Sequence, residues 1–178
     1  MSRGARSGPP GDLTAFYADQ FDRVRGSLVL FTGSREAGEE LAQEAFVRAC
    51  QHWEKVRAMD APGAWVHRVG INLAISRSRK LKTERQAHRR VQADLSAPTD
   101  VSADGGELRS ALLDLSPDER AVVVLRFYGD LSVSQVADIL AIPEGTVKTR
   151  TRTGLAALRC SDVAASIDLD LDPAEEAR

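Results

Sequence analysis

The stretch LSVSQVADILAIPEGTVKTRTR, from Leu131 to Arg152, predicts two short helices joined by a tight turn. Ser132 and Gln135 have the S-x-x-Q spacing of a capping box, which marks the start of the first helix. Apolar residues then recur at helical spacing up to Ile142, and a second helix starts near Pro143 or Glu144. This pattern is typical of a helix-turn-helix, whose second helix reads DNA.

The second helix has two different sides. Its expected inner side carries Val147, Thr151, Leu155 and Leu158, and its outer side carries Lys148, Thr149 and Arg152. Side chains near the start of such a helix reach base edges, whereas lysine and arginine hold phosphates. An ordinary three-helix bundle with a solvated basic face is the alternative. Even a true helix-turn-helix indicates DNA binding and no more, since it would equally suit the output domain of a response regulator.

A further helix is predicted just before this pair. In SPDER, Ser116 is a good N-cap, Pro117 suits the first helical position, and Glu119 completes a second capping box. The run AVVVLRFY then supplies a buried helix, which Gly129 can end.

The whole chain has 178 residues, of which 43% are hydrophobic and 28% charged, with a formal net charge of -2. Helical spacing dominates, and strand-like alternation is scarce, so we expect an all-α protein of two small helical domains joined by a flexible linker. The expected segments are a disordered lead over 1–11, a helical block over 12–90, a small polar linker over 91–106, a second block over 107–160, and an acidic tail over 161–178.

Several protein classes are disfavoured. Cys50 and Cys160 are too few for a disulfide framework, and no Cys/His pair with metal-site spacing accompanies them, so we expect no metal and no cofactor. The N-terminal stretch lacks the apolar run of a signal peptide, and no segment is apolar over the length of a bilayer. A cytoplasmic protein without membrane insertion is the expectation.

Charge separates within the first block. Between Glu36 and Glu54 acidic residues dominate, and between Gly63 and Arg90 basic residues dominate. The acidic helix is expected to pack through Ala42, Phe46, Ala49 and Trp53. Its other side is either a solvated surface or a docking face for a basic partner, and the pattern alone does not decide between them.

The basic helix, APGAWVHRVGINLAISRSRKLK, carries two stripes. Trp65, Val69 and Leu73 are expected to be buried, whereas Arg68, Asn72, Ser76 and Arg79 form an exposed stripe. An asparagine between arginines suits a nucleic-acid strand, because its amide can both donate to and accept from a base edge.

With these motifs in place, the sequence resembles the sigma factors of bacterial RNA polymerase, in the extracytoplasmic-function group that keeps only sigma regions 2 and 4. EELAQEAFVRACQHW followed by APGAWVHRVGINLAISRSRK resembles region 2, and LSPDERAVVVLRFYGDLSVSQVADILAIPEGTVKTR resembles region 4. The sequence is also similar to those of the actinobacterial SigE-like subgroup.

The resemblance implies a role for each surface. The acidic helix would dock on the clamp helices of the polymerase's largest subunit through Glu40, Gln43, Glu44 and Val47, and the flap of the second subunit would be a further contact. The loop Lys55–Gly63 and the basic helix would capture the −10 element as a melted strand with a flipped base. The residues implied for the −10 element are Arg68, Asn72, Ser76, Arg77, Arg79 and Lys80.

The second block would read the −35 element as duplex. The residues implied are Glu144, Thr146, Lys148, Thr149, Arg150 and Arg152, with Arg150 alternatively bracing the helix against the phosphates. Two positions depart from the family pattern: Ser76 stands where many relatives have Asp, and Thr153-Gly154 stands where many have Arg and a small residue.

The function implied is promoter recognition and transcription initiation with core RNA polymerase. The chain would not be an enzyme, promoter DNA would be its second partner, and an anti-sigma factor is a candidate third. The alternative is a free-standing helix-turn-helix transcriptional regulator, which would bind duplex DNA tightly by itself. A helical interaction protein with no role in DNA binding is a third class.

Overall fold

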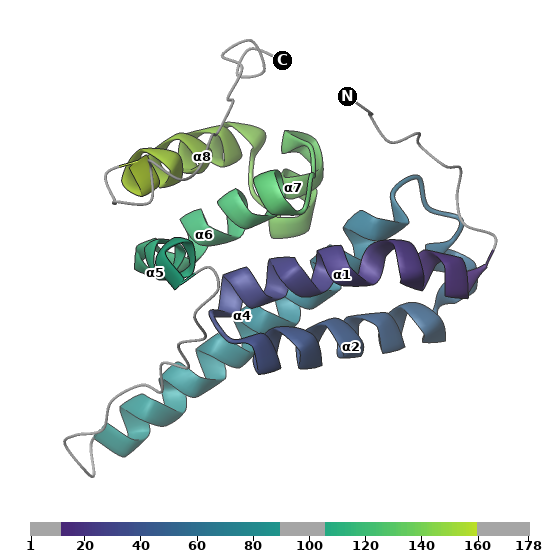
Figure 1. The fold of residues 1–178 in the computed structure, drawn as a ribbon, viewed down its shortest axis with the longest axis horizontal. Coiled ribbons are helices and arrows are strands. Elements are labelled where there is room, and N and C mark those ends of the chain that lie inside the picture. The colour runs from purple at the N-terminus through teal and green to yellow at the C-terminus, as the bar shows by residue number, and fades with distance from the viewer. Residues whose placement is uncertain (1–11, 90–105, 160–178) are drawn as a thin grey trace.

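The computed structural model describes residues 12–89 and 106–159, with side chains placed for 12–80 and 106–159. All regular elements in these ranges are helical (Figure 1). They are α1 (Leu13–Thr32), α2 (Arg35–Gln51), α3 (Trp53–Val56), α4 (Pro62–Arg89), α5 (Gly106–Asp114), α6 (Pro117–Val123), the π-helical turn η1 (Val124–Tyr128), α7 (Val133–Leu140) and α8 (Glu144–Arg159). The all-α prediction is confirmed. The predicted lead, linker and tail fall almost wholly outside the described residues.

Helices α1, α2 and α4 pack together, with the short α3 between α2 and α4, and we call α1 to α4 the N-terminal unit. Asp12 caps α1 by accepting from the Thr14 amide at 3.0 Å. Gly33 ends α1 in the left-handed conformation (φ 71°), and its amide donates to the Val29 carbonyl at 2.8 Å. Ser34 then caps α2 one residue later. Two caps in succession make the tight turn that folds α2 back along α1.

The crossing of α1 and α2 depends on Gly38. A Cβ at this position would lie 2.5 Å from the backbone nitrogen of Val29, so only glycine permits this approach. At the other end of the pair, Phe16 packs against Phe46 and Trp53, with ring centroids 5.9 and 5.2 Å apart. Aromatic pairs at such separations contribute beyond the area they bury.

Helix α4 buries a different line of residues from the one its sequence predicts. The most buried positions are Val66, His67, Gly70, Ile71 and Ala74. The predicted stripe of Trp65, Val69 and Leu73 is only half-buried along one edge of this face. A spacing of four residues advances by 400°, so each step drifts 40° around the helix, and the prediction followed this drifting edge. Beyond the bundle, the C-terminal part of α4 projects away from the other helices (Figure 1).

Helices α5 to α8 form the C-terminal unit, and both capping boxes predicted in it are confirmed. Ser116 and Glu119 cap α6, and Ser132 and Gln135 cap α7. The π-helical turn after α6 ends at Gly129, whose amide donates to the Val124 carbonyl at 2.9 Å.

The turn between α7 and α8 has one feature that its sequence does not predict. Ala141 takes the left-handed conformation (φ 53°), where glycine or asparagine would be usual. Its amide donates to the Ala137 carbonyl and so closes α7. Ile142 then packs partly buried against the core, as predicted.

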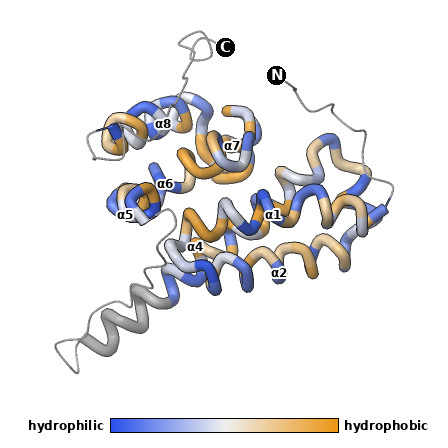
Figure 2. Tube along the Cα trace, viewed as in Figure 1, coloured by the Kyte–Doolittle hydropathy of each residue, from blue (hydrophilic) through white to orange (hydrophobic). Residues whose placement is uncertain are grey.

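The two units share a core. One continuous buried cluster joins Leu28, Ile71 and Ala74 of the N-terminal unit to Val122 and Val136 of the C-terminal unit. Figure 2 shows hydrophobic segments on α1, α6 and α7. Both predicted helical domains are therefore present, and in the described residues they pack against each other. The predicted flexible linker lies almost wholly outside these residues.

Candidate nucleic-acid and protein interfaces

The exposed stripe on α4 is present as predicted. Arg68, Asn72, Ser76 and Arg79 are all exposed. They lie opposite the buried line around Gly70, so the core orients the stripe toward solvent. Asn72 therefore offers an amide donor and an amide acceptor, with the cationic Arg68 one turn before it and Arg79 two turns after it.

Arg77 and Lys80 sit differently on the same helix. Arg77 reaches across to α2 and forms an ion pair with Glu40. The structure therefore joins one predicted DNA-binding residue to one predicted polymerase-binding residue. Both side chains are about half exposed, at 46% and 63%, so the pair contributes little to stability and either partner can exchange it for another. Lys80 is exposed near the end of the described side chains.

The loop predicted over Lys55–Gly63 is shorter in the structure. Lys55 and Val56 belong to α3, and Gly63 belongs to α4, which leaves residues 57–61 as the connection. Arg57 is bound to Glu54 by two hydrogen bonds of 2.9 and 2.5 Å. Val56 is fully buried and fixes the loop to the bundle.

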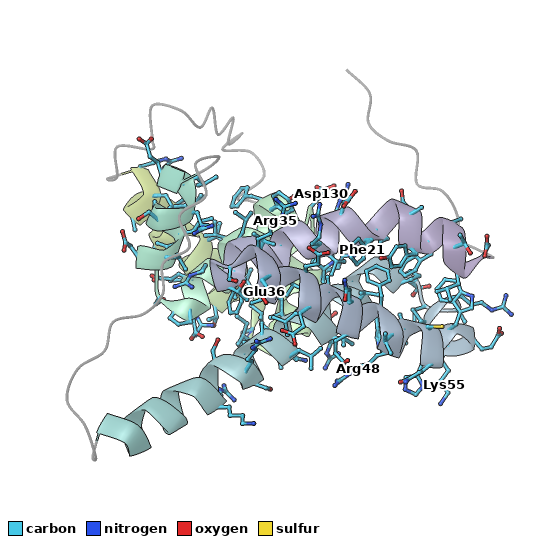
Figure 3. All side chains as sticks on the ribbon, turned by 60° about the horizontal axis from the view of Figure 1, so that its bottom comes forward. Phe21, Arg35, Glu36, Arg48, Lys55 and Asp130 are labelled. Carbon is cyan, nitrogen blue, oxygen red and sulfur yellow. The ribbon has the colours of Figure 1, made fainter. Side chains whose placement is uncertain are left out.

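A second exposed face lies on α2. Glu40, Gln43, Glu44 and Val47 all point to solvent on one side of the helix, and we call these four residues the docking face. Val47 is 51% exposed, which places an apolar group beside the carboxylates. Glu44 is bound to Arg48 at 2.9 Å. Figure 3 marks Glu36 and Arg48 near the two ends of this helix.

His67 lies behind the α4 stripe and was assigned no role from the sequence. It is only 2% exposed. Its Nδ1 donates to the Gly63 carbonyl at 3.0 Å, which leaves Nε2 to accept from the Ser27 hydroxyl at 3.3 Å. Burial lowers the pKa of His67 below its usual value, and the nearby Arg23 charge acts in the same direction. The burial of His67 could have been predicted from the sequence, because His67 shares the inner side of α4 with Val66, Gly70 and Ile71.

Helix α8 has the expected inner and outer sides. Val147, Leu155 and Leu158 are buried, whereas Lys148 and Arg152 are exposed. Glu144 and Thr149 are also exposed, and Thr146 is half-buried in the first turn. The Thr149 hydroxyl donates to the Gly145 carbonyl at 2.9 Å. Its proton is thus already used, and Thr149 can offer DNA an acceptor and a methyl group.

Arg150 is held inside the C-terminal unit. Its Nη2 donates to Asp118 at 2.6 Å and so ties α8 to the start of α6. The sequence left open whether Arg150 contacts DNA directly or braces the helix against the phosphates. In the structure its side chain is bound to Asp118 of the same unit.

The departure at Thr153-Gly154 lies on the same side of α8. A Cβ on Gly154 would lie 2.8 Å from Val123, so the small residue sets the approach of α8 to α6. Hydrogen bonds from Ser116 and Thr153 lower the pKa of Glu119, which keeps this carboxylate ionised at the contact. Gly154 therefore serves the packing of the unit, and the exposed Thr153 adds a hydrogen bond to Glu119.

The described residues show neither a metal site nor a membrane-spanning helix. Among the described residues, no three His, Cys, Asp or Glu side chains gather as a metal site would require. Within the same ranges, no helix has the length and apolar composition needed to span a membrane.

Comparisons with known proteins fit this geometry. The family model for sigma-70 region 2 matches residues 17–84, and the one for sigma-70 region 4 matches residues 111–159. The chain is 32% identical over 163 residues to the ECF RNA polymerase sigma factor SigW of Bacillus subtilis, covering 83% of this chain and 86% of the relative. It is 33% identical over 165 residues to the RNA polymerase sigma-E factor of Streptomyces coelicolor, covering 89% and 92%.

A solved structure shares the fold. The sigma factor RpoE of Bartonella quintana, crystallised with the anti-sigma factor NepR, matches with a TM-score of 0.73 at 20% identity, over 89% of this chain and 99% of that one. Two region models in the expected order and relatives matched over most of their length leave one assignment: the chain belongs to the sigma-70 family, in the extracytoplasmic-function group of RNA polymerase sigma factors.

Proposed function

We propose that this sigma factor binds core RNA polymerase through α2, captures the melted −10 element with α4, and reads the −35 element as duplex with α8. The observation that carries the proposal is the distribution of the three surfaces. An acidic and apolar face lies on α2, and a basic face lies on each of two other helices, so the protein partner and the two DNA segments would each have a separate surface.

The docking face on α2 suits a protein partner with basic and apolar groups. Glu40 and Glu44 supply the charge, and the half-exposed Val47 supplies an apolar contact at the C-terminal end of the face. Both carboxylates have arginine partners within the chain at half-exposed positions. Exchanging these weak pairs for arginines of the clamp helices costs little, because exposed ion pairs are worth about 0–1 kcal/mol.

The stripe on α4 suits a single strand. The Asn72 amide can read the edge of an extruded base, and Arg68 and Arg79 can hold the backbone on either side. Extruding a base costs a few kcal/mol, which these contacts would offset. Ser76 is exposed on the same stripe and contributes a short neutral side chain to the strand contact.

The outer side of α8 suits the major groove. Lys148 and Arg152 are exposed for phosphates, and Glu144 stands in the first turn, where a carboxylate can accept from a cytosine amino group. In this proposal Arg150 acts mainly through its hydrogen bond to Asp118, which sets the angle at which α8 packs against α6. The chain itself catalyses no reaction, and the polymerase supplies the chemistry.

The test is a reconstitution with purified core RNA polymerase from a bacterium that encodes this chain. A stable complex should form and should start transcripts on genomic fragments that core alone does not transcribe. Glu40→Lys should abolish the complex. Asp19→Lys, which makes the same charge change at an exposed site of α1, should leave it intact.

Arg77→Ala is a second control, because it removes the ion pair to Glu40 without changing α2. Normal binding by Arg77→Ala would assign the effect of Glu40→Lys to the docking face. Specific duplex binding by the chain alone, with no polymerase complex, would favour the free-standing regulator and overturn the proposal.

A further inference from the structure

His67 lies directly behind the surface that we assign to the −10 strand, and the proposed function gives it no task. In the described part of the chain, Ser27 and His67 are the buried polar side chains, and they contact each other. Burying polar groups costs free energy even where they are hydrogen-bonded, and an apolar residue would avoid this cost. The pair therefore indicates a role other than filling the core.

The imidazole joins α1 to the first turn of α4. Its Nδ1 donates to the Gly63 carbonyl at 3.0 Å, and its Nε2 accepts from the Ser27 hydroxyl of α1 at 3.3 Å. Because Ser27 donates to Nε2, the ring proton stays on Nδ1, which is the atom that contacts Gly63. Ser27 thus selects the tautomer that can hold the start of α4.

A second side chain of α1 lies against the same residue. A Cβ on Gly63 would lie 2.5 Å from Oε1 of Gln20, so the Gln20 amide rests directly on the Gly63 backbone. Gly63 is therefore contacted by α1 through Gln20 and is held by His67, which α1 orients in turn.

These contacts give the connection over residues 57–61 an anchor at each end. Val56, just before it, is fully buried, and Gly63, just after it, is bound to His67. Residues 57–60 between the two anchors are exposed. A loop whose two ends are fixed by buried contacts presents its exposed residues in one position.

The same turn of α4 begins the strand-binding stripe. Arg68 follows His67 directly, and Asn72 lies one turn further on. The contact between His67 and Gly63 therefore lies between the loop and the stripe, which must act on the same extruded base.

We propose that His67 is a positioning residue for capture of the −10 strand: its neutral imidazole holds the Gly63 carbonyl and so fixes the loop over residues 57–61 relative to the stripe on α4. The inference rests on the proposed function. His67 does not touch the strand. Its loss should impair promoter opening, which needs loop and stripe in one arrangement, and should leave polymerase binding through α2 unchanged.

Capture of the strand should then depend on pH. Burial lowers the pKa of His67 below 6.5, and Arg23 of α1 acts in the same direction. The buried residues of α2, α3 and α7 are all apolar, so these neighbours offer no carboxylate to compensate a charge. A proton on Nε2 would place an unpaired charge in the core and remove the acceptor for Ser27. Positioning should therefore be complete above pH 6.5 and weaken as the pH falls below that value.

The test compares two substitutions in the reconstituted polymerase complex. His67→Asn places an amide nitrogen near the position of Nδ1, where it can donate to the Gly63 carbonyl. His67→Gln places its amide near the position of Nε2, where it can reach Ser27 and leaves Gly63 unbound. At neutral pH, His67→Asn should keep promoter opening, and His67→Gln should lower it about fivefold, the effect of one lost hydrogen bond. Neither should change polymerase binding.

The second readout is the response of opening to acid. From about pH 7.5 to about pH 5.5, the unmodified chain should lose opening and His67→Asn should not, because asparagine does not titrate. The acid response of the polymerase itself is measured with its principal sigma factor and divided out. His52→Asn, at an exposed histidine, is the matched control and should lose opening in acid as the unmodified chain does.

Three outcomes would overturn the proposal: equal opening by His67→Asn and His67→Gln, an equal acid response of His67→Asn and the unmodified chain, or a flat corrected acid profile of the unmodified chain. Helical circular dichroism checks that each variant is folded, and the profile of the unmodified chain decides even where a variant is not. A chain that forms no polymerase complex contradicts the proposed function instead. A complex that opens promoters without regard to residue 67 contradicts the positioning role alone.

Discussion

The N-terminal and C-terminal units are stabilised in different ways. The C-terminal unit is marked by local devices: two complete capping boxes start α6 and α7, and each involves residues only three positions apart. The first two helices of the N-terminal unit start with single caps at Asp12 and Ser34, and the packing of this unit depends on contacts between distant residues, such as Gly38 against the Val29 backbone and His67 against Ser27. Local devices can be read from sequence, whereas close approaches between helices appear only in the folded chain.

The largest expected change in stability is in the N-terminal unit. Gly38→Ala places a methyl group 2.5 Å from the Val29 backbone nitrogen, which cannot rotate away, so α2 must move off α1. We expect a loss of about 1–3 kcal/mol or more in the free energy of unfolding. Urea unfolding followed by tryptophan fluorescence measures it, because Trp53 and Trp65 are the two tryptophans of the chain and both lie in this unit.

Gly145→Ala is the control for that measurement. An added Cβ there meets nothing within 4 Å, so the same substitution should be neutral or slightly stabilising. Equal effects of the two changes would show that the α1–α2 crossing does not depend on Gly38.

An intermediate effect is expected in the C-terminal unit. Ser132→Ala removes the side chain that accepts from the Gln135 amide at the start of α7 and should cost about 1 kcal/mol. Thermal unfolding followed by helical circular dichroism measures the cost. Ser110→Ala, at an exposed position inside α5, should change little. A negligible effect of Ser132→Ala would mean that tertiary packing, and not local capping, stabilises this unit as well.

The smallest effect concerns pH. Burial lowers the pKa of His67 from 6.5, so the unfolded chain binds its proton more readily than the folded chain does. The contribution of neutral His67 to stability is therefore complete above pH 6.5 and is lost as the pH falls below that value toward the lower folded pKa. His67→Gln should flatten this part of the pH profile of stability in urea unfolding.

An exposed histidine provides the control. His52→Gln should retain the acid sensitivity that comes from His67. A profile that stays equally steep after His67→Gln would show that other groups cause the loss of stability in acid.

The difference between the units also explains what the sequence could predict. The caps at Ser116 and Ser132, the end at Gly129 and the two sides of α8 were all predicted, because each follows from neighbours within a turn or two. The buried line of α4 was misplaced by a fraction of a turn, since Trp65, Val69 and Leu73 drift around the helix. The partners of Arg77 and Arg150 could not be predicted, because each lies more than thirty residues away.

The packing of the two units was missed for the same reason. The linker composition predicted a flexible tether, and composition contains no information on whether the tethered parts attract each other. Gly26 was the available signal, as a glycine in the middle of an otherwise regular helix. Tyr128, whose hydroxyl oxygen would lie 2.0 Å from a Cβ on Gly26, is about a hundred residues further along the chain, so the two could not be paired from the sequence.

The measurement that tests the central claim most directly compares two variants in the reconstituted polymerase complex. Promoter binding is followed by gel shift, and opening is followed by chemical probing of unpaired bases at the −10 element. Asn72→Ala should keep binding to the duplex and lose opening. Lys148→Ala with Arg152→Ala should weaken binding itself and reduce the dependence of log K on log salt by about 2, one unit for each lost phosphate contact. Equal losses of binding and opening in both variants would contradict the division of labour between α4 and α8.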